Sequence, residues 1–141
     1  MLIGISPVLG PDLLHVLRAM GHGDEIALVD GNYPAAEHAR KLVRADGIDI
    51  VAMLAAVLGV LPVEAAFRAG LNNDPLQASA IHRRIDDLLV ASAFCQPATP
   101  LAGADLYPRI KSTFAIVATS ECVPYANVIL RKGVIAASDD V

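Results

Sequence analysis

The chain has 141 residues, of which 55% are hydrophobic and 18% charged, and its formal net charge is −4. This length suits one domain with a sizeable core, so we expect a single domain over residues 1–141. The negative charge argues against a nucleic-acid partner, which favours a basic face, and the strongly apolar, uncharged stretch over residues 50–63 is shorter than the ~20 residues of a membrane-spanning helix.

The first half of the chain predicts two helices and a buried strand between them. Pro11–Met20 carries an apolar stripe at helical spacing and ends before a glycine. Glu25–Val29 is typical of a buried strand and delivers Asp30 at its end. Arg44–Gly47 indicates a turn. Asp49–Leu58 is apolar nearly all round, which indicates a helix buried on most sides.

In the second half, the clearest helix is predicted over Pro75–Phe94, with His82 on its polar face. A Pro-rich connection follows over Gln96–Gly103, and Ala104–Thr113 is expected to be a short helix broken by Pro108. Three further strands are predicted over residues 64–68, 114–119 and 126–131. This alternation predicts an α/β fold, a compact domain with a mixed sheet flanked by helices.

Three short segments place polar residues among these apolar elements. Glycines on both sides of His22 leave its ring open to a ligand, and a histidine both gives and takes a proton near neutral pH. The other two segments hold the pairs Tyr107/Arg109 and Tyr125/Asn127, which combine apolar rings with directed donors and acceptors, as polyhydroxylated ligands require. Taken alone, each of these side chains also has an ordinary structural interpretation.

Two separated motifs resemble one known family. Residues 21–26, Gly-His-Gly-Asp-Glu-Ile, followed by Asp30, resemble the opening of L-fucose mutarotases, as does Tyr107-x-Arg109 before Phe-Ala-Ile-Val. Residues 120–130, followed by Gly-Val, resemble the C-terminal end of D-ribose pyranases. The chain therefore resembles the L-fucose mutarotase / D-ribose pyranase family from about residue 5 to residue 134, and more closely the fucose type.

The resemblance implies a role for each matched residue. His22 takes the place of the family's proton donor, and Asp30 that of the aspartate that contacts the sugar. The remaining substrate-binding positions fall on Tyr107, Arg109, Tyr125, Ala126 and Asn127. The family's fold and its ring of subunits, often a decamer with sites near subunit interfaces, are implied in the same way. Some fucose-type members carry a further ligand aspartate near the middle of the chain, for which Glu64 is only a loose substitute.

The implied reaction is anomer exchange of a monosaccharide, most closely L-fucose. Opening a hemiacetal needs a base at the anomeric hydroxyl and an acid at the ring oxygen, so we expect no cofactor and no metal. The alternatives are a D-ribose pyranase, which exchanges pyranose and furanose forms, and a non-catalytic sugar-binding module. A metal-dependent hydrolase would use His22, Asp24, Asp30 and His38.

Composition also bears on assembly and location. The low charge and high apolar content predict a homo-oligomer that hides apolar surface. The start of the chain lacks the basic region of a signal peptide, and Cys95 and Cys122 suggest no disulfide framework, so we expect a cytoplasmic protein.

Overall fold

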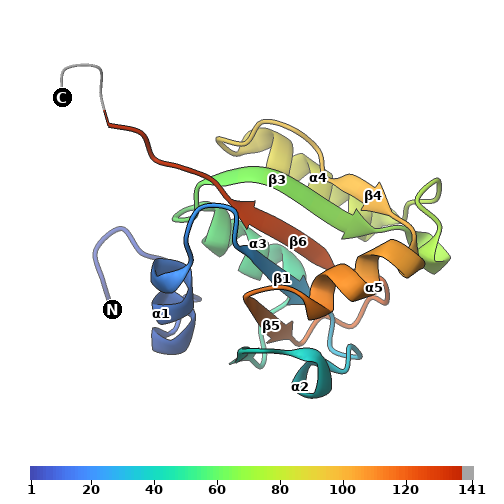
Figure 1. Ribbon diagram of the computed structural model, residues 1–141, viewed down its shortest axis with the longest axis horizontal. Helices are drawn as coiled ribbons and strands as arrows, with labels where there is room; N and C mark the ends of the chain where they lie inside the picture. Colours follow the sequence, from blue (N-terminus) through green and yellow to red (C-terminus); the bar gives the residue numbers. More distant parts are fainter. Residues whose placement is uncertain (138–141) are drawn as a thin grey trace.

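The computed structural model describes residues 1–137 and is built around one six-stranded sheet (Figure 1). The strand order is β2-β5-β1-β6-β3-β4. The strands are β1 (Glu25–Val29), β2 (Leu42–Ala45), β3 (Val63–Ala69), β4 (Thr99–Leu101), β5 (Ala115–Thr119) and β6 (Val128–Lys132). The helices are α1 (Pro11–Ala19), α2 (Ala35–His38), α3 (Ile50–Leu58), α4 (Ala80–Ala91) and α5 (Gly103–Lys111), with a 3-10 turn, η1, at Leu71–Asn73. The predicted α/β fold with a mixed sheet flanked by helices is confirmed.

The direction of the strands gives the sheet two chemically distinct edges. β1 runs parallel to β5, and β5 parallel to β2, whereas β6 runs antiparallel to both of its neighbours, β1 and β3. The carboxyl ends of β1, β3 and β5 therefore lie at one edge together with the start of β6. We call this end of the strands the carboxyl edge, which is distinct from the two sides of the sheet formed by the outer strands β2 and β4. The opposite edge, where β1, β3 and β5 begin and β6 ends, is the amino edge.

Alternating side chains of the strands fill two separate cores. On one face, Ile26 and Leu28 of β1 pack with buried residues of α1, α3 and α4. On the other face, Ala27 and Val29 pack with α2 and α5. Figure 1 shows α2 and α5 together in front of the sheet, with α3 and α4 behind it. Because both faces of β1 are buried, the strand reads as a continuous apolar run.

Several predicted elements agree with the structure within a residue or two, among them α1, β1, α3 and β5. α4 begins at Ala80 rather than Pro75 because Ser79 caps the helix in extended backbone geometry. α5 is continuous through Pro108, which removes only the bond to the carbonyl of Ala104, a residue exposed to solvent.

Three details differ from the prediction. The first two residues of the turn expected at Arg44–Gly47 belong to the outer strand β2, which ends at Ala45. The Pro-rich connection contains the short strand β4. β4 pairs only with β3, at the edge of the sheet, where a proline is tolerated. His82 is fully buried, not solvated, because both of its ring nitrogens find partners inside the protein.

Within residues 1–137, no helix is long and apolar enough to cross a membrane.

Candidate functional site

A cavity of ≈ 330 Å³ opens at the carboxyl edge, where β1 and β5 end and β6 begins. It is lined by Asp30, Asn32, Tyr33, Pro34, His38, Tyr107, Pro124, Tyr125 and Asn127. In open α/β sheets, ligands bind in crevices outside the carboxyl ends of the strands, and this cavity has that position. Four residues predicted from sequence line it together, namely Asp30, Tyr107, Tyr125 and Asn127.

Asp30 supplies the acidic group of this cavity. The residue is only 6% exposed, and one of its carboxylate oxygens accepts a hydrogen bond of 2.9 Å from the backbone N–H of Asn32. Burial raises the pKa of Asp30 above its ordinary value, while backbone N–H groups of Asn32, Tyr33, Ala126 and Tyr125 act in the opposite direction. The carboxylate is thus held by amides from two loops that are distant in sequence.

Asn127 joins these loops to the sheet. Its Oδ1 atom accepts a hydrogen bond of 2.9 Å from the backbone N–H of Asp30, and its carbonyl oxygen accepts one of 3.0 Å from the N–H of Ala69. Ala126, also predicted as a substrate-binding residue, is completely buried. Its side chain does not line the cavity, and its backbone N–H is one of the groups that lower the pKa of Asp30.

Aromatic rings form one wall of the cavity. Tyr33 and Tyr107 are stacked with their ring centroids 6.2 Å apart, and the Tyr107 hydroxyl donates a 2.9 Å hydrogen bond to Oδ1 of Asn73. The Tyr33 hydroxyl lies 2.9 Å from Nδ1 of His38. Burial, with a smaller contribution from Tyr107, raises the pKa of Tyr33 to about 12. The phenol therefore stays protonated near neutral pH, and the direction of its hydrogen bond with Nδ1 of His38 follows the tautomer of the imidazole.

The other predicted residues, His22 and Arg109, lie at the amino edge. Nε2 of His22 is 2.9 Å from Oε2 of Glu64, and both side chains are accessible to solvent. Arg109 donates two hydrogen bonds, of 2.9 and 2.7 Å, to the carboxylate of Glu25, and its guanidinium lies 3.8 Å from the ring centre of Phe67. Arg131 also donates to Glu25, at 3.0 Å.

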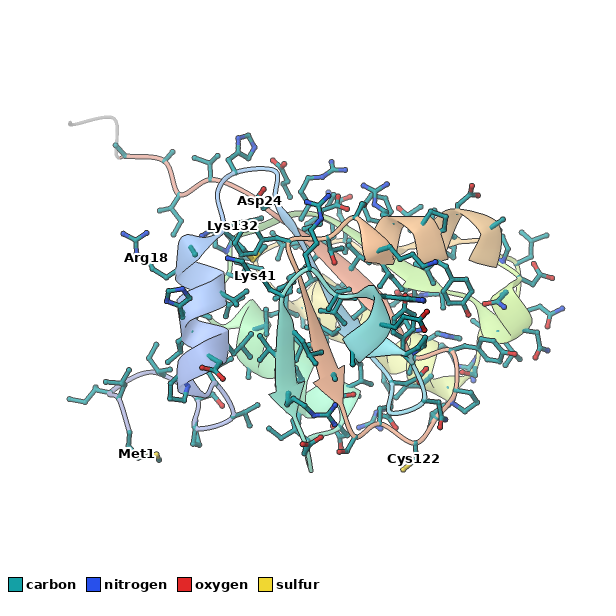
Figure 2. The ribbon with its side chains drawn as sticks, turned by 60° about the horizontal axis from the view of Figure 1, so that its bottom comes forward. Met1, Arg18, Asp24, Lys41, Cys122 and Lys132 are labelled. Atoms are coloured by element: carbon teal, nitrogen blue, oxygen red, sulfur yellow. The ribbon has the colours of Figure 1, made fainter. Side chains whose placement is uncertain are left out.

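The two groups of residues are separated by the length of β1. His22 precedes this strand and Asp30 follows it, and five extended residues span about 16 Å. Figure 2 shows the separation from a second direction, with Asp24 and Lys132 near one end of the strands and Cys122 near the other. Within one protomer, His22 therefore does not meet the residues that line the cavity, and Arg109 is not one of those residues.

Asn32 and Tyr33 line the cavity but were not among the predicted site residues, and His38 was named only for the alternative hydrolase. A signal for them exists in the sequence, because the polar run that begins at Asp30 directly follows a buried strand. His22 and Asp24 lie at the amino edge, whereas Asp30 and His38 lie at the carboxyl edge. Within residues 1–137, no group of three or more His, Cys, Asp or Glu side chains is placed to hold a metal ion, so the set proposed for a hydrolase is not assembled there.

A larger cavity, of ≈ 410 Å³, is lined mainly by apolar side chains of α1, the segment after α3 and the end of β6. It contains none of the residues predicted from sequence. Its polar groups include Arg18 and Lys132, and the Lys132 ammonium group already donates to the carbonyl oxygens of Leu17 and Met20. The polar and aromatic cavity at the carboxyl edge is therefore the better candidate site.

The mixed sheet and this cavity define a class, that of small α/β proteins with a candidate small-molecule site outside the carboxyl ends of the strands. The model of the RbsD / FucU transport protein family matches residues 3–135, and the chain belongs to this family. The family prediction from sequence is confirmed.

Individual relatives support the same family assignment. An L-fucose mutarotase from Haemophilus influenzae is 37% identical over 140 residues, which cover 95% of this chain and 97% of that protein. The crystal structure of a fucose mutarotase from Streptococcus pneumoniae, in complex with L-fucose, is similar with a TM-score of 0.85 and 36% identity, over 96% of this chain and all of the other. Bacillus subtilis RbsD, complexed with D-ribose, shares the fold with a TM-score of 0.75 and 22% identity, over 91% of this chain and 95% of that one.

Proposed function

We propose that this chain is a sugar mutarotase that interconverts the anomers of L-fucose. The observation that carries the proposal is the convergence of Asp30, Tyr125 and Asn127 on one cavity, in a chain that is 37% identical to an L-fucose mutarotase over nearly its whole length. The cavity offers what a monosaccharide requires, since aromatic rings pack against its apolar C–H face while amide and carboxylate groups bind its hydroxyls.

The reaction requires two proton transfers and no change in oxidation state. A base removes the proton from the anomeric hydroxyl, the bond between C1 and the ring oxygen breaks, and an acid protonates the ring oxygen. After rotation about the C1–C2 bond, the hydroxyl attacks either face of the aldehyde and both protons return. We assign the main proton transfer to His22, with Asp30 holding a sugar hydroxyl. Positioned acid–base groups typically increase the rate of such a reaction by about 10²–10⁴-fold.

A complete site then requires two copies of the chain. His22 lies about 16 Å along β1 from Asp30, too far to reach a sugar bound in the cavity within the same protomer, and Arg109 is not among the residues that line the cavity. In a homo-oligomer, the amino edge of one copy can cover the carboxyl edge of another, which places His22 beside a neighbour's Asp30. Exposed apolar side chains support assembly, among them Leu2, Ile3 and Ile135. We therefore propose a closed homo-oligomer, in keeping with the rings of ten subunits that the family resemblance implies.

Glu64 completes this proposal at the amino edge. Its carboxylate lies 2.9 Å from Nε2 of His22, close enough to fix the ring and its tautomer before the sugar enters. This arrangement would replace the additional aspartate of other fucose-type proteins. We further place the enzyme in the cytoplasm, where the exposed thiols of Cys95 and Cys122 would remain reduced.

Saturation-transfer NMR on L-fucose, D-ribose and L-rhamnose tests the function directly. Saturating the H1 signal of one anomer should reduce the signal of the other only when protein accelerates exchange, and most strongly for L-fucose. Faster exchange of D-ribose would favour a pyranase. Binding detected by calorimetry without accelerated exchange of any sugar would favour a non-catalytic sugar-binding module.

A further inference from the structure

Tyr125 has a backbone conformation that needs an external restraint. Its φ angle is 62°, in the left-handed region that aromatic residues rarely occupy. The other non-glycine residues with positive φ in the described part of the chain are Asn72, Asn73 and Cys95. Of these four, only Tyr125 lines the cavity at the carboxyl edge.

The restraint comes from α4. The carbonyl oxygen of Tyr125 lies 2.7 Å from Nε2 of His82, a residue 43 positions earlier that is 0% exposed. The second ring nitrogen of His82, Nδ1, accepts a 3.0 Å hydrogen bond from the backbone N–H of Ser79, which caps α4. With Nδ1 accepting, the proton of the neutral ring is on Nε2, so His82 donates to Tyr125.

One peptide unit carries this contact into the site. The carbonyl of Tyr125 and the N–H of Ala126 belong to the same planar trans peptide, in which the two groups point in opposite directions. His82 binds the carbonyl on one side, and the Ala126 N–H on the other side is one of the backbone groups that lower the pKa of the Asp30 carboxyl. A hydrogen bond to the carbonyl polarises its peptide, so the donor at His82 also strengthens the effect of the Ala126 N–H on the Asp30 carboxylate.

We infer that His82 is a positioning residue of the sugar site, which fixes the Tyr125–Ala126 peptide so that the Tyr125 ring and the Asp30 carboxylate face the sugar together. This inference rests on the proposed function, since it assigns His82 a part in sugar binding. His82 does not line the cavity and touches no substrate. It acts through Tyr125 and Asp30.

Protonation of His82 should break the arrangement. A proton on Nδ1 would face the N–H of Ser79, so the two donors would repel each other and move the ring, which takes Nε2 away from the Tyr125 carbonyl. The charged groups around the ring are Arg68 of β3 and Arg83 and Asp86 of α4. Burial, the larger influence, lowers the pKa of His82 below its ordinary value, and the two arginines act in the same direction. The neutral donor is therefore the form present near neutral pH, and it is lost as the solution becomes acidic.

Two substitutions separate the roles of the ring nitrogens. In His82→Gln, the side-chain amide nitrogen takes the place of Nε2 and still donates to Tyr125. In His82→Asn, the amide oxygen takes the place of Nδ1 and still accepts from Ser79, but nothing reaches Tyr125. We expect His82→Asn to weaken L-fucose binding and raise KM on the order of tenfold, with a smaller effect on kcat, while His82→Gln stays near wild type. Ser79→Ala is the control for a purely structural effect and should lower the Tm without changing KM.

The binding constant is measured by calorimetry and KM by NMR exchange, from pH 5 to 8. Wild-type KM should rise on the acidic side, and the His82→Gln profile should lack the part of that rise that His82 causes. Equal KM values for the Asn and Gln variants would overturn the inference. If His82→Asn fails to fold, an unchanged acidic rise in His82→Gln would overturn it instead. If the wild-type protein binds L-fucose and the variants give either of these results, only the role of His82 is refuted. If the wild-type protein neither binds nor exchanges a sugar, the proposed function is refuted.

Discussion

Asn127 and Asp30, which are 97 residues apart, are joined by a 2.9 Å hydrogen bond from the backbone N–H of Asp30 to Oδ1 of Asn127. This hydrogen bond joins the start of β6 to the end of β1 at the mouth of the cavity, which both residues line. A side chain that is expected to hold the sugar therefore also satisfies a buried backbone donor, so substitutions of Asn127 should affect stability and binding together.

Asn127→Ala should lower the free energy of unfolding by about 1–3 kcal/mol, because it leaves the N–H of Asp30 buried without an acceptor. Asn32→Ala, which removes the same side chain from an exposed position, is the matched control for stability. Denaturant unfolding of both variants measures the difference. A midpoint for Asn127→Ala equal to that of wild type would show that this hydrogen bond contributes nothing to stability.

His22→Ala should lose most of the exchange activity, on the order of 10²-fold or more, and remain folded. Its side chain is 60% exposed, so little packing is lost. His15→Ala, at an exposed position on α1, is the control and should retain full activity. Saturation-transfer NMR measures both. Wild-type exchange rates in His22→Ala would move the proton transfer to His38, the histidine that lines the cavity.

Mixed oligomers can test whether each site uses two copies. His22→Ala and Asp30→Ala should each be inactive alone, since each removes one half of every site. When the two variants are unfolded together and refolded as an equal mixture, about a quarter of the sites should contain both native residues, if subunits combine at random. Recovery of exchange activity towards that level would support a shared site. A mixture as inactive as its components would show that no site combines His22 of one copy with Asp30 of another.

Arg109 should contribute to the choice of sugar. Its guanidinium is fixed by Glu25 and Phe67, so its donors suit some hydroxyl patterns and leave others unpaired. The cost of an unpaired buried group, about 1–3 kcal/mol, corresponds to a preference of roughly tenfold or more. We expect faster exchange of L-fucose than of D-ribose, with Arg109→Ala narrowing the gap and Arg109→Lys narrowing it less. An unchanged ratio of the two rates in Arg109→Ala would show that Arg109 does not select the sugar.

Local patterns predicted much of the fold because they involve interactions between near neighbours. β1 and α3 are apolar runs bounded by a turn or a capping aspartate, and both were predicted nearly to the residue. β4 has three residues and contains Pro100, so its strand conformation depends on pairing with β3, which no local pattern shows. His82 follows the same logic. Its position on α4 matches a polar face, and only the distant carbonyl of Tyr125 makes burial favourable.

The candidate site was predictable in part for a related reason. Asp30 and Asn127 belong to segments that end and begin neighbouring antiparallel strands, so the topology brings them together. The cavity also includes Tyr33 and His38, whose orientation depends on α2 and on the Tyr107 ring. The distance between His22 and Asp30 follows from the strand that separates them in the sequence, but a family motif lists residues without showing which copy of the chain supplies each one.

The close packing at Gly70 gives a test of the fold itself. A Cβ atom at this position would overlap the backbone carbonyl oxygen of Asp74, so Gly70→Ala should destabilise the protein by about 1–3 kcal/mol. Gly21→Ala, where a Cβ would make ordinary contact with Asp24, is the control. Thermal unfolding should show a lower Tm for Gly70→Ala alone, and equal Tm values would mean that the η1 turn relaxes without cost.

The length of β1 carries a consequence for the architecture of the proposed oligomer. Inserting two residues would keep its alternation of buried faces, so the core of each subunit would tolerate the change. The same insertion would move His22 about 7 Å away from Asp30 along the strand. In a closed ring, every subunit repeats one fixed rotation, and a longer spacer between the two contact surfaces would change that angle. The length of β1 would then help to determine the number of subunits in the ring. The length of this strand in the family should therefore vary together with ring size rather than with the sugar.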